Sequence, residues 1–405
     1  METITVITSG QNIQVVSINA AAQGPAGTSP TIANYGDNRI LTSDGSSTGI
    51  NGEGNLTFNG SSLVINSGLT TSTGNFTSNI TSSLLNIDNI RIDGNTISST
   101  NTNGNLIIQT TGTGAIQRDS GGNSRGQYAI DLQNARNSGT QVAAANYSNI
   151  LGGSGNQIVS DSIYSNINGG AINTISASGG YNFIGGGYEN TISNINSGAD
   201  SVICGGNGNT IAGEFYGNAI IGGGYGNIIE HSNNEQRVPE AAIIPGGYEA
   251  KATRWGELSH AAGRFTNAGD AQHTILIARK LTTDNTANVI LLLDNGISGS
   301  YKLELPNKTT WTFEIKLSAY NDTDSAGGGW IFKGAIRSDG SGNTAIIGVG
   351  FTAESWLDTA MSGASADVVA NDTTNSLDIR VTGLSGKNIR WVAVIDISQV
   401  CYGTP

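Results

Sequence analysis

Apolar residues recur in the middle of the chain at a regular and unusual spacing. The pattern Ile-x-Gly-Gly-x-x-Asn-x-Ile places a glycine pair and one asparagine between two isoleucines. It fits five segments in full: Ile150–Ile158, Ile167–Ile175, Ile184–Ile192, Ile203–Ile211 and Ile221–Ile229. Ile244–Ala252 and His260–Ala268 keep part of it. Successive copies start 17, 17, 19, 18, 23 and 16 residues apart, so an internal repeat governs the fold class.

The repeat favours coils of β-strand over helices, because helices disfavour this much glycine and asparagine. Two short apolar strands separated by a glycine turn can form one coil of a stacked sheet. Glycine supplies positive φ angles at the corner, and the recurring asparagine is expected to form a hydrogen-bonded ladder between coils. We predict a β-solenoid over residues 148–270, with repeats mostly 17 to 19 residues long.

The isoleucine rows also predict an oligomer. One such coil buries little apolar surface, and a single chain would leave a broad isoleucine face in water. Three chains wound about one axis would bury these faces together, and cyclic symmetry closes the assembly. We therefore predict an elongated homotrimer whose solenoids form a triple β-roll.

The final third alternates apolar and polar residues with the period of two that is typical of strands. Strands are expected at Thr274–Lys280, Asn288–Leu293, Tyr301–Leu305, Thr310–Ala319, Trp330–Arg337, Thr344–Val349, Leu377–Thr382 and Ile389–Ile397. Turn residues separate them at intervals typical of sandwiches. We predict a jelly-roll-like β-sandwich over residues 271–405.

The N-terminal third shows the same alternation in shorter runs. Strands broken by Asp-Gly, Asn-Gly and Gly-Asn turns fill residues 36–65 and 90–116, which predicts a β-rich shaft over residues 31–126. Alanine, leucine and glutamine cluster over residues 127–147, where we expect a junction that is either helical or a coil. The whole chain is therefore predicted to be all-β.

Composition and charge exclude several classes of protein. The net charge of −12 argues against a nucleic-acid partner, which would require a basic face. The N-terminus lacks the basic start and apolar run of a signal peptide, and no stretch approaches the length of a membrane span. Cys204 and Cys401 show no metal-ligand spacing. No disulfide is expected, which suits synthesis in a reducing host cytoplasm without secretion.

Several segments resemble known families. Asn218–Ile229, NAIIGGGYGNII, is similar to the coil repeat of trimeric autotransporter adhesin heads, and similar repeats occur in bacteriophage tail fibres. The period here is longer than in the adhesins, and neither a secretion signal nor a membrane-anchor barrel is evident. Residues 36–65 and 90–116 closely resemble shaft segments of phage tail fibres, including those of cyanophages.

The resemblance to tail fibres extends to both ends of the chain. A short apolar strand followed by QGPAG resembles the head of many fibre proteins, whose N-terminus docks onto the virion. It implies anchoring to a tail or baseplate protein through residues 1–30, here by Ile4, Val6, Ile13 and Val15. Residues 274–400 resemble a C-terminal module of fibre and tail-associated proteins, which implies a receptor-binding tip.

A search for catalytic chemistry finds little. The three histidines are His231, His260 and His273, and no serine sits in a G-x-S-x-G turn. His260 and His273 could bind a metal on a threefold axis, but polar packing explains them as well. The acidic residues on the coils are scattered, although a glycan depolymerase would need a carboxylate pair. We predict no catalytic residue, no metal and no cofactor, and we expect that the chain is not an enzyme.

Two groups of residues are candidates for recognition. Tyr188, Tyr225 and Tyr248 share one repeat position and could stack on sugar rings or simply cover a corner. In the C-terminal region, the expected loop at residues 321–329 follows Tyr320, and polar loops on a rigid scaffold often recognise ligands. The receptor-binding candidates are Tyr320, Asp322, Asp324 and Trp356, the last being equally compatible with a buried or interface position.

The sequence thus predicts a virion component, a trimeric tail fibre that binds a host-surface glycan or outer-membrane receptor through its C-terminal tip. Three tips on one stalk would turn weak contacts into avid attachment. Two alternatives stay open. One is a tailspike-type glycan depolymerase, and the other is a fibre that decorates the capsid.

Overall fold

The described part of the chain is almost entirely β-structure. A computed structural model describes the strands at residues 32–33, 39–43, 50–58 and 63–65, residue 103, and residues 107–194, 200–213, 218–231, 239–294, 301–348 and 350–405. Within these residues the one helix is the single 3-10 turn η1 (Thr359–Met361), which confirms the all-β prediction. None of the described helical structure has the length and apolar character needed to cross a membrane.

The chain divides into two compact units, Met1–Thr100 and Asn101–Pro405. The first contains one small sheet of β1 (Ile32–Ala33), β2 (Arg39–Ser43), β3 (Ile50–Phe58) and β4 (Leu63–Ile65). Strand β3 pairs with the other three, parallel to β1 and antiparallel to β2 and β4. The anchoring candidates Ile4, Val6, Ile13 and Val15 lie outside the described residues.

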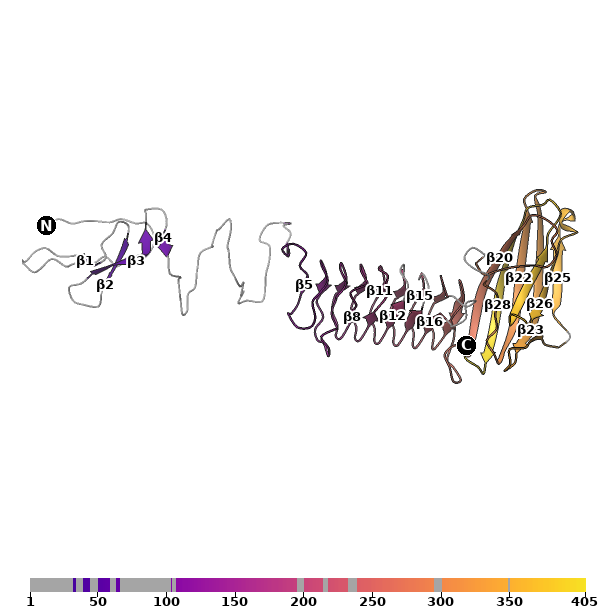
Figure 1. Cartoon of the computed structure of the whole chain (residues 1–405), viewed down its shortest axis with the longest axis horizontal. Helices are drawn as coiled ribbons and strands as arrows, with labels where there is room; N and C mark the ends of the chain where they lie inside the picture. Colours follow the sequence, from indigo (N-terminus) through magenta and orange to yellow (C-terminus); the bar gives the residue numbers. More distant parts are fainter. Residues whose placement is uncertain are drawn as a thin grey trace, which may run out of the picture. The chain divides into compact units, whose positions relative to one another are not determined.

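The second unit begins with a β-solenoid, as the repeat predicted (Figure 1). One parallel stack consists of β5 (Ile116–Gln117), β6 (Ile130–Asp131), β7 (Asn149–Ile150), β9 (Asn166–Ile167), β11 (Phe183–Ile184), β13 (Val202–Ile203), β15 (Ile220–Ile221), β17 (Ile243–Ile244) and β19 (Leu258–His260). The other consists of β8 (Gln157–Ile158), β10 (Thr174–Ile175), β12 (Thr191–Asn194), β14 (Thr210–Gly213), β16 (Ile228–Glu230) and β18 (Lys251–Ala252). Strand β6 lies in the segment for which we expected a junction, so the stack begins before residue 148.

The repeated isoleucines fill the interior of each coil. Both isoleucines of every complete repeat are 0% exposed in the single chain. Our expectation that these rows would face water in a lone chain is therefore wrong. The isoleucines of the two strand stacks point toward each other, so the solenoid of a single chain has a narrow hydrophobic core of its own. The buried isoleucine rows therefore give no physical reason for a homotrimer.

Glycine and asparagine hold neighbouring coils together. Gly170 adopts φ +78°, and a Cβ at this position would lie 2.1 Å from the carbonyl oxygen of Gly187 in the next coil, so a side chain cannot fit. Buried Asn190 donates from Nδ2 to Oδ1 of Asn173 at 3.1 Å, and its own Oδ1 accepts from Nδ2 of Asn209 at 3.0 Å. The expected asparagine ladder is confirmed.

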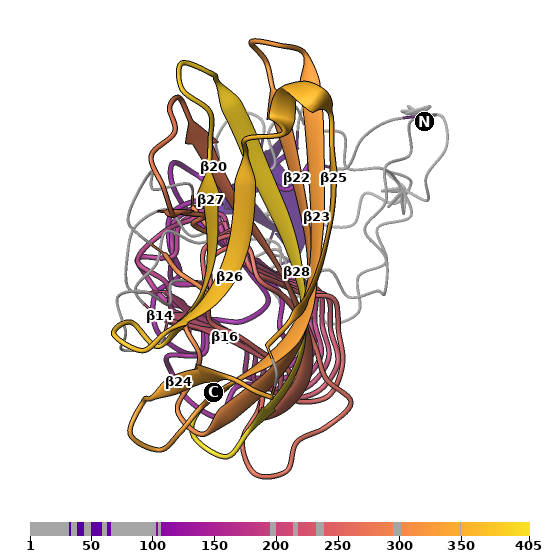
Figure 2. The same cartoon turned by 90° about the vertical axis from the view of Figure 1, so that its right-hand side faces the viewer.

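The first stack continues directly into a large antiparallel sheet. Strand β19 pairs with β20 (Ala271–Thr282), and the order continues as β28 (Ile389–Cys401), β22 (Thr309–Asn321), β23 (Ala326–Ser338) and β24 (Thr344–Ile346), with β25 (Thr352–Leu357) also on β23. A second sheet contains β21 (Val289–Ile290), β27 (Ser376–Thr382) and β26 (Ser365–Asn371). Figure 2 shows β26 and β27 in front of the large sheet.

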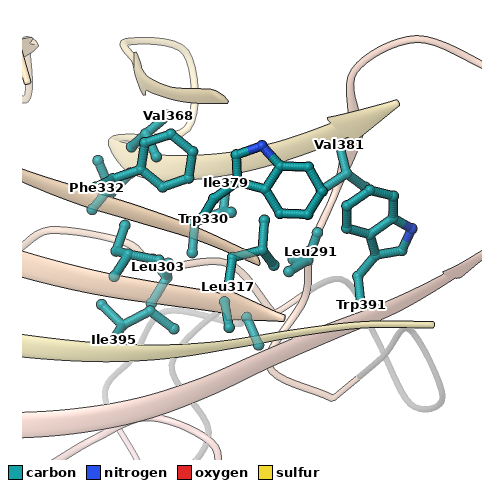
Figure 3. Close-up of a cluster of buried hydrophobic side chains, with 14 of the residues drawn as sticks. Leu291, Leu303, Leu317, Trp330, Phe332, Val368, Ile379, Val381, Trp391 and Ile395 are labelled. Carbon is teal, nitrogen blue, oxygen red and sulfur yellow. The ribbon is translucent and has the colours of Figure 1, made fainter. Parts of the chain in front are cut away.

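The two sheets share one hydrophobic core. Trp330 and Trp391 of the large sheet lie with their ring centroids 5.4 Å apart, and Ile379 and Val381 of β27 belong to the same buried cluster (Figure 3). Alternate residues of β22 and β28 point into this core and the others face outward. The large sheet therefore has one buried face and one outer face.

Buried Arg254 joins the last coil to these sheets. Arg254 Nη1 lies 3.3 Å from Glu257 Oε1, its Nη2 donates to the backbone oxygen of Glu304 at 3.0 Å, and its guanidinium carbon lies 5.1 Å from the ring centroid of Trp311. The contacts of Arg254 with Glu304 and Trp311 connect the solenoid to the C-terminal sheets, and Glu257 compensates its buried charge.

Candidate functional site

The fold gathers the four C-terminal candidates at one end of the large sheet. Tyr320 is the second-last residue of β22, Asp322 and Asp324 lie in the turn that follows, and Trp356 is the second-last residue of β25. Strand β23 runs between these two strands. Its Gly327 pairs with Tyr320 and its Gly329 with Trp356. Directly paired residues of antiparallel strands share a face, and Tyr320 and Trp356 are 52% and 55% exposed on the outer one.

The glycines between the two aromatic rings are not required by the backbone. A Cβ at Gly327 would meet nothing closer than 3.7 Å, and one at Gly329 nothing closer than 3.8 Å. Neither has a φ in the left-handed region. Glycine inside a strand costs roughly 0.5–1 kcal/mol, and it often marks a place where a ligand approaches the backbone. We call Tyr320, Gly327, Gly329 and Trp356 the recognition face.

Polar groups border the recognition face. Arg390 and Ser318 are exposed, and they pair with Tyr320 and Gly329 respectively. A flat floor between two aromatic rings, with a guanidinium and a hydroxyl beside it, offers apolar contact together with hydrogen-bond donors. This combination suits a sugar, which presents C–H faces and hydroxyl groups.

The turn beside the recognition face is held rigidly. Asn321 is buried, and its Oδ1 accepts from the backbone of Thr323 at 3.1 Å. Lys387 Nζ donates to Asp324 Oδ1 at 2.6 Å, and Asn321 Nδ2 donates to the other carboxylate oxygen at 2.9 Å. The Lys387 ammonium, followed by Asn321, lowers the pKa of Asp324. Asp324 therefore shapes the turn, since both of its oxygens already have partners.

The histidines and cysteines of the described residues lie apart from one another or in pairs. They contain no group of three or more histidine, cysteine or acidic side chains placed to hold an ion. His260 and His273 are opposite each other on β19 and β20, and His273 Nε2 lies 3.0 Å from Asp396 Oδ1. Cys204 and Cys401 are both free thiols.

The predicted tyrosine column of the repeats is interrupted. Tyr188, Asn207, Tyr225 and Tyr248 follow one another in adjacent coils. The rings of Tyr225 and Tyr248 stack with centroids 4.8 Å apart, which covers one face of each. Tyr188 is separated from them by Asn207, and a hydrogen bond to Glu189 raises the pKa of its phenol.

A longer tyrosine row was missed from the sequence. Tyr128, Tyr147, Tyr164 and Tyr181, here called the tyrosine ladder, stack in successive coils with centroids 5.1, 4.9 and 5.2 Å apart. The last three each lie three residues before the first isoleucine of a repeat. That constant offset is the signal that could have revealed them.

The tyrosine ladder has an unusual backbone. Its four φ angles lie between +56° and +64°, which costs a bulky residue roughly 1–2 kcal/mol each. Three stacked pairs return roughly 0.5–1.5 kcal/mol each, so stacking at best offsets the strain. The same corner in later coils is formed by Asn218, Ala241 and Gly256. The turn therefore does not require tyrosine, and the stacking gives no net stabilisation that would explain the choice of tyrosine at these positions.

Comparison with known proteins gives only distant matches. No protein-family model and no curated protein matches the chain. Among solved structures, the tailspike protein of Acinetobacter baumannii phage AM24 is 11% identical, with a TM-score of 0.18, over 68% of this chain and 67% of that one. The tailspike protein gp49 of Acinetobacter baumannii bacteriophage Fri1 is 9% identical, with a TM-score of 0.20, over 68% of this chain and 62% of that one. These values are too low to transfer a site or an activity.

One expectation is corrected by this comparison. The Fri1 protein is described as a capsular polysaccharide depolymerase, which is an enzyme. This conflicts with our expectation that the chain is not an enzyme, and we withdraw that expectation.

Proposed function

We propose that the chain is a phage tail protein that attaches the virion to a glycan on the host surface through the recognition face. The observation that carries the proposal is the bare floor of Gly327 and Gly329 between exposed Tyr320 and Trp356. The resemblance of residues 36–65 and 90–116 to fibre shafts supports the assignment to a phage. Docking to a tail or baseplate protein through residues 1–30 belongs to the same proposal, and the C-terminal sheets would form its sandwich-like tip.

The same proposal includes a homotrimer, now for a different reason. The residue before each buried isoleucine of the first stack, and the one before buried Ser259 in β19, faces outward, and toward the C-terminal end these residues become apolar. The outward row consists of Phe183, Val202, Ile220, Ile243 and Leu258, and it continues through register into Ile275 of β20. A row of this kind on each of three copies would bury apolar surface about a common axis.

Glycan binding by the full chain tests the attachment function. Purified protein would be applied to a panel of immobilised capsular polysaccharides and lipopolysaccharides from different bacteria. We expect binding to a subset, weakened about tenfold or more by Trp356→Ala, since one aromatic anchor at a binding site often contributes over 1 kcal/mol. Tyr402→Ala is the matched control, because Tyr402 is an exposed aromatic residue outside the recognition face.

A second variant separates binding from folding. Gly329→Val places a side chain on the floor, where a Cβ has room, so the fold is retained while the ligand is excluded. Unchanged binding by both Trp356→Ala and Gly329→Val would refute the recognition face, and no binding to any panel member would refute attachment to a glycan. Release of reducing ends in the same samples would show that the bound glycan is also cleaved.

A further inference from the structure

The tyrosine ladder forms an exposed aromatic row along the solenoid. Its four members are 41% to 64% exposed, and each belongs to the coil next to that of its neighbour. We propose that this ladder is a second binding surface, which takes an extended, neutral glycan chain. This inference does not depend on the recognition face, because the two surfaces share no residue.

The chemistry of the ladder leaves its polar groups available. Within the part of the chain that the structure describes, no residue hydrogen-bonds to any of the four phenol hydroxyls. Asparagine, alanine and glycine adopt the same backbone corner in later coils. The hydroxyls have no partner within the described residues, and the corner could be formed without aromatic residues. Both observations favour a role for the tyrosines in binding a ligand. Each hydroxyl can both donate to and accept from a sugar hydroxyl.

The spacing of the ladder selects the class of partner. Neighbouring rings are 4.9 to 5.2 Å apart, and this repeat comes from the stacking of the coils. An extended peptide advances about 3.3 Å per residue and falls out of step with the rings. An extended chain of β-1,4-linked pyranoses advances by about one coil per sugar, with alternate sugars turned over, so each sugar lies beside one tyrosine. The residues before the four tyrosines are Gln127, Asn146, Ile163 and Gly180, all uncharged, which favours a neutral chain.

The stacking also determines which parts of the rings a glycan reaches. Inside the ladder, neighbouring rings cover each other's faces, so ring edges and hydroxyls make the contacts. At the C-terminal end, Tyr181 is the most exposed of the four, and the equivalent position in the next coil is Asp200. No tyrosine therefore covers its outer face, which can pack against the C–H face of a terminal sugar.

A double substitution in the full chain tests the ladder. Tyr147→Asn combined with Tyr164→Asn removes its centre, and Asn218 already occupies the equivalent corner with φ +60°, so the fold should be retained. The matched control is Phe265→Ala combined with Tyr402→Ala. It also removes two exposed aromatic rings, but both lie outside the tyrosine ladder and the recognition face.

The probe is cellohexaose, an extended neutral β-linked hexasaccharide, and maltohexaose is the comparison because its α-linkages curve the chain. Ligand-observed NMR titration should show that the unaltered chain prefers cellohexaose. The ladder variant should bind it at least about tenfold more weakly, while the control variant stays within about twofold. Equal binding by the ladder variant, or no preference for cellohexaose, would overturn the proposal. A changed sedimentation coefficient in the ladder variant would overturn it too, because the row would then be a contact between copies.

Discussion

Two neighbouring glycines of one solenoid coil should respond differently to substitution by alanine. The difference in the free energy of unfolding tests the backbone geometry of the coil. Gly169 and Gly170 are adjacent, yet a Cβ at Gly169 meets nothing within 4 Å, whereas one at Gly170 would lie 2.1 Å from Gly187 O. Gly170→Ala would place alanine in the left-handed region, at about 1–2 kcal/mol. It would also displace a carbonyl that accepts hydrogen bonds from Ala171 N at 2.8 Å and Asn173 Nδ2 at 3.1 Å. Two weakened hydrogen bonds add about 1 kcal/mol each, so the free energy of unfolding should fall by about 3–4 kcal/mol.

Urea titration followed by far-UV circular dichroism measures this difference. The midpoint for Gly170→Ala should fall by about 1 M or more, given slopes of about 3 kcal/mol/M for a chain of this size. Gly169→Ala should leave the midpoint unchanged or raise it slightly, because alanine restricts the unfolded chain. Similar midpoints for the two variants would show that the coils are not packed as described.

Two further predictions concern buried polar groups. Asn190→Ala leaves the carbonyl oxygen of Gly186 and the backbone N–H of Asn209 without their partner, and it removes one of the hydrogen bonds to Gly206 O and to Asn173 Oδ1. It should therefore lower the free energy of unfolding by about 3 kcal/mol in the same titration; an effect below about 1 kcal/mol would contradict the ladder. Burial raises the pKa of Asp270, but hydrogen bonds from the backbone amides of Asn267, Thr266 and Phe265 outweigh it and leave the pKa lowered. The stability that Asp270 contributes is therefore present above its ordinary pKa of 3.8 and is lost as the pH falls through the lower folded value. Between about pH 5 and about pH 2, the melting temperature should fall less for Asp270→Asn than for the unaltered chain. An equal fall in melting temperature would contradict this assignment.

The periodicity of the sequence was sufficient to predict the solenoid, but not which residues face inward. Ile184 and Phe183 are both apolar and adjacent, and strand geometry places them on opposite sides of the wall. Only the closure of the coil shows that Ile184 is in the interior and that Phe183 remains partly exposed. The expected isoleucine interface was therefore wrong, whereas the glycine turn and the asparagine ladder were confirmed.

The recognition face was only partly predictable from the sequence. Tyr320 and Trp356 were chosen as aromatic residues near polar loops, and the pairing of β22, β23 and β25 then placed them on one side of the sheet. Gly327 and Gly329 were expected in a loop, because a run of glycines is typical of turns. They lie inside β23, where cross-strand hydrogen bonds compensate for their flexibility. Their role in the recognition face depends on the open space beside them. That space is formed by the packing of neighbouring strands and cannot be predicted from the local sequence.

A structure of the full chain with the glycan it binds would test the central claim most directly. We predict sugar density above Gly327 and Gly329, between the rings of Tyr320 and Trp356 and within hydrogen-bond distance of Arg390 or Ser318. Density for the bound glycan that leaves this face empty would contradict the assignment of host recognition to the end of the C-terminal sheet.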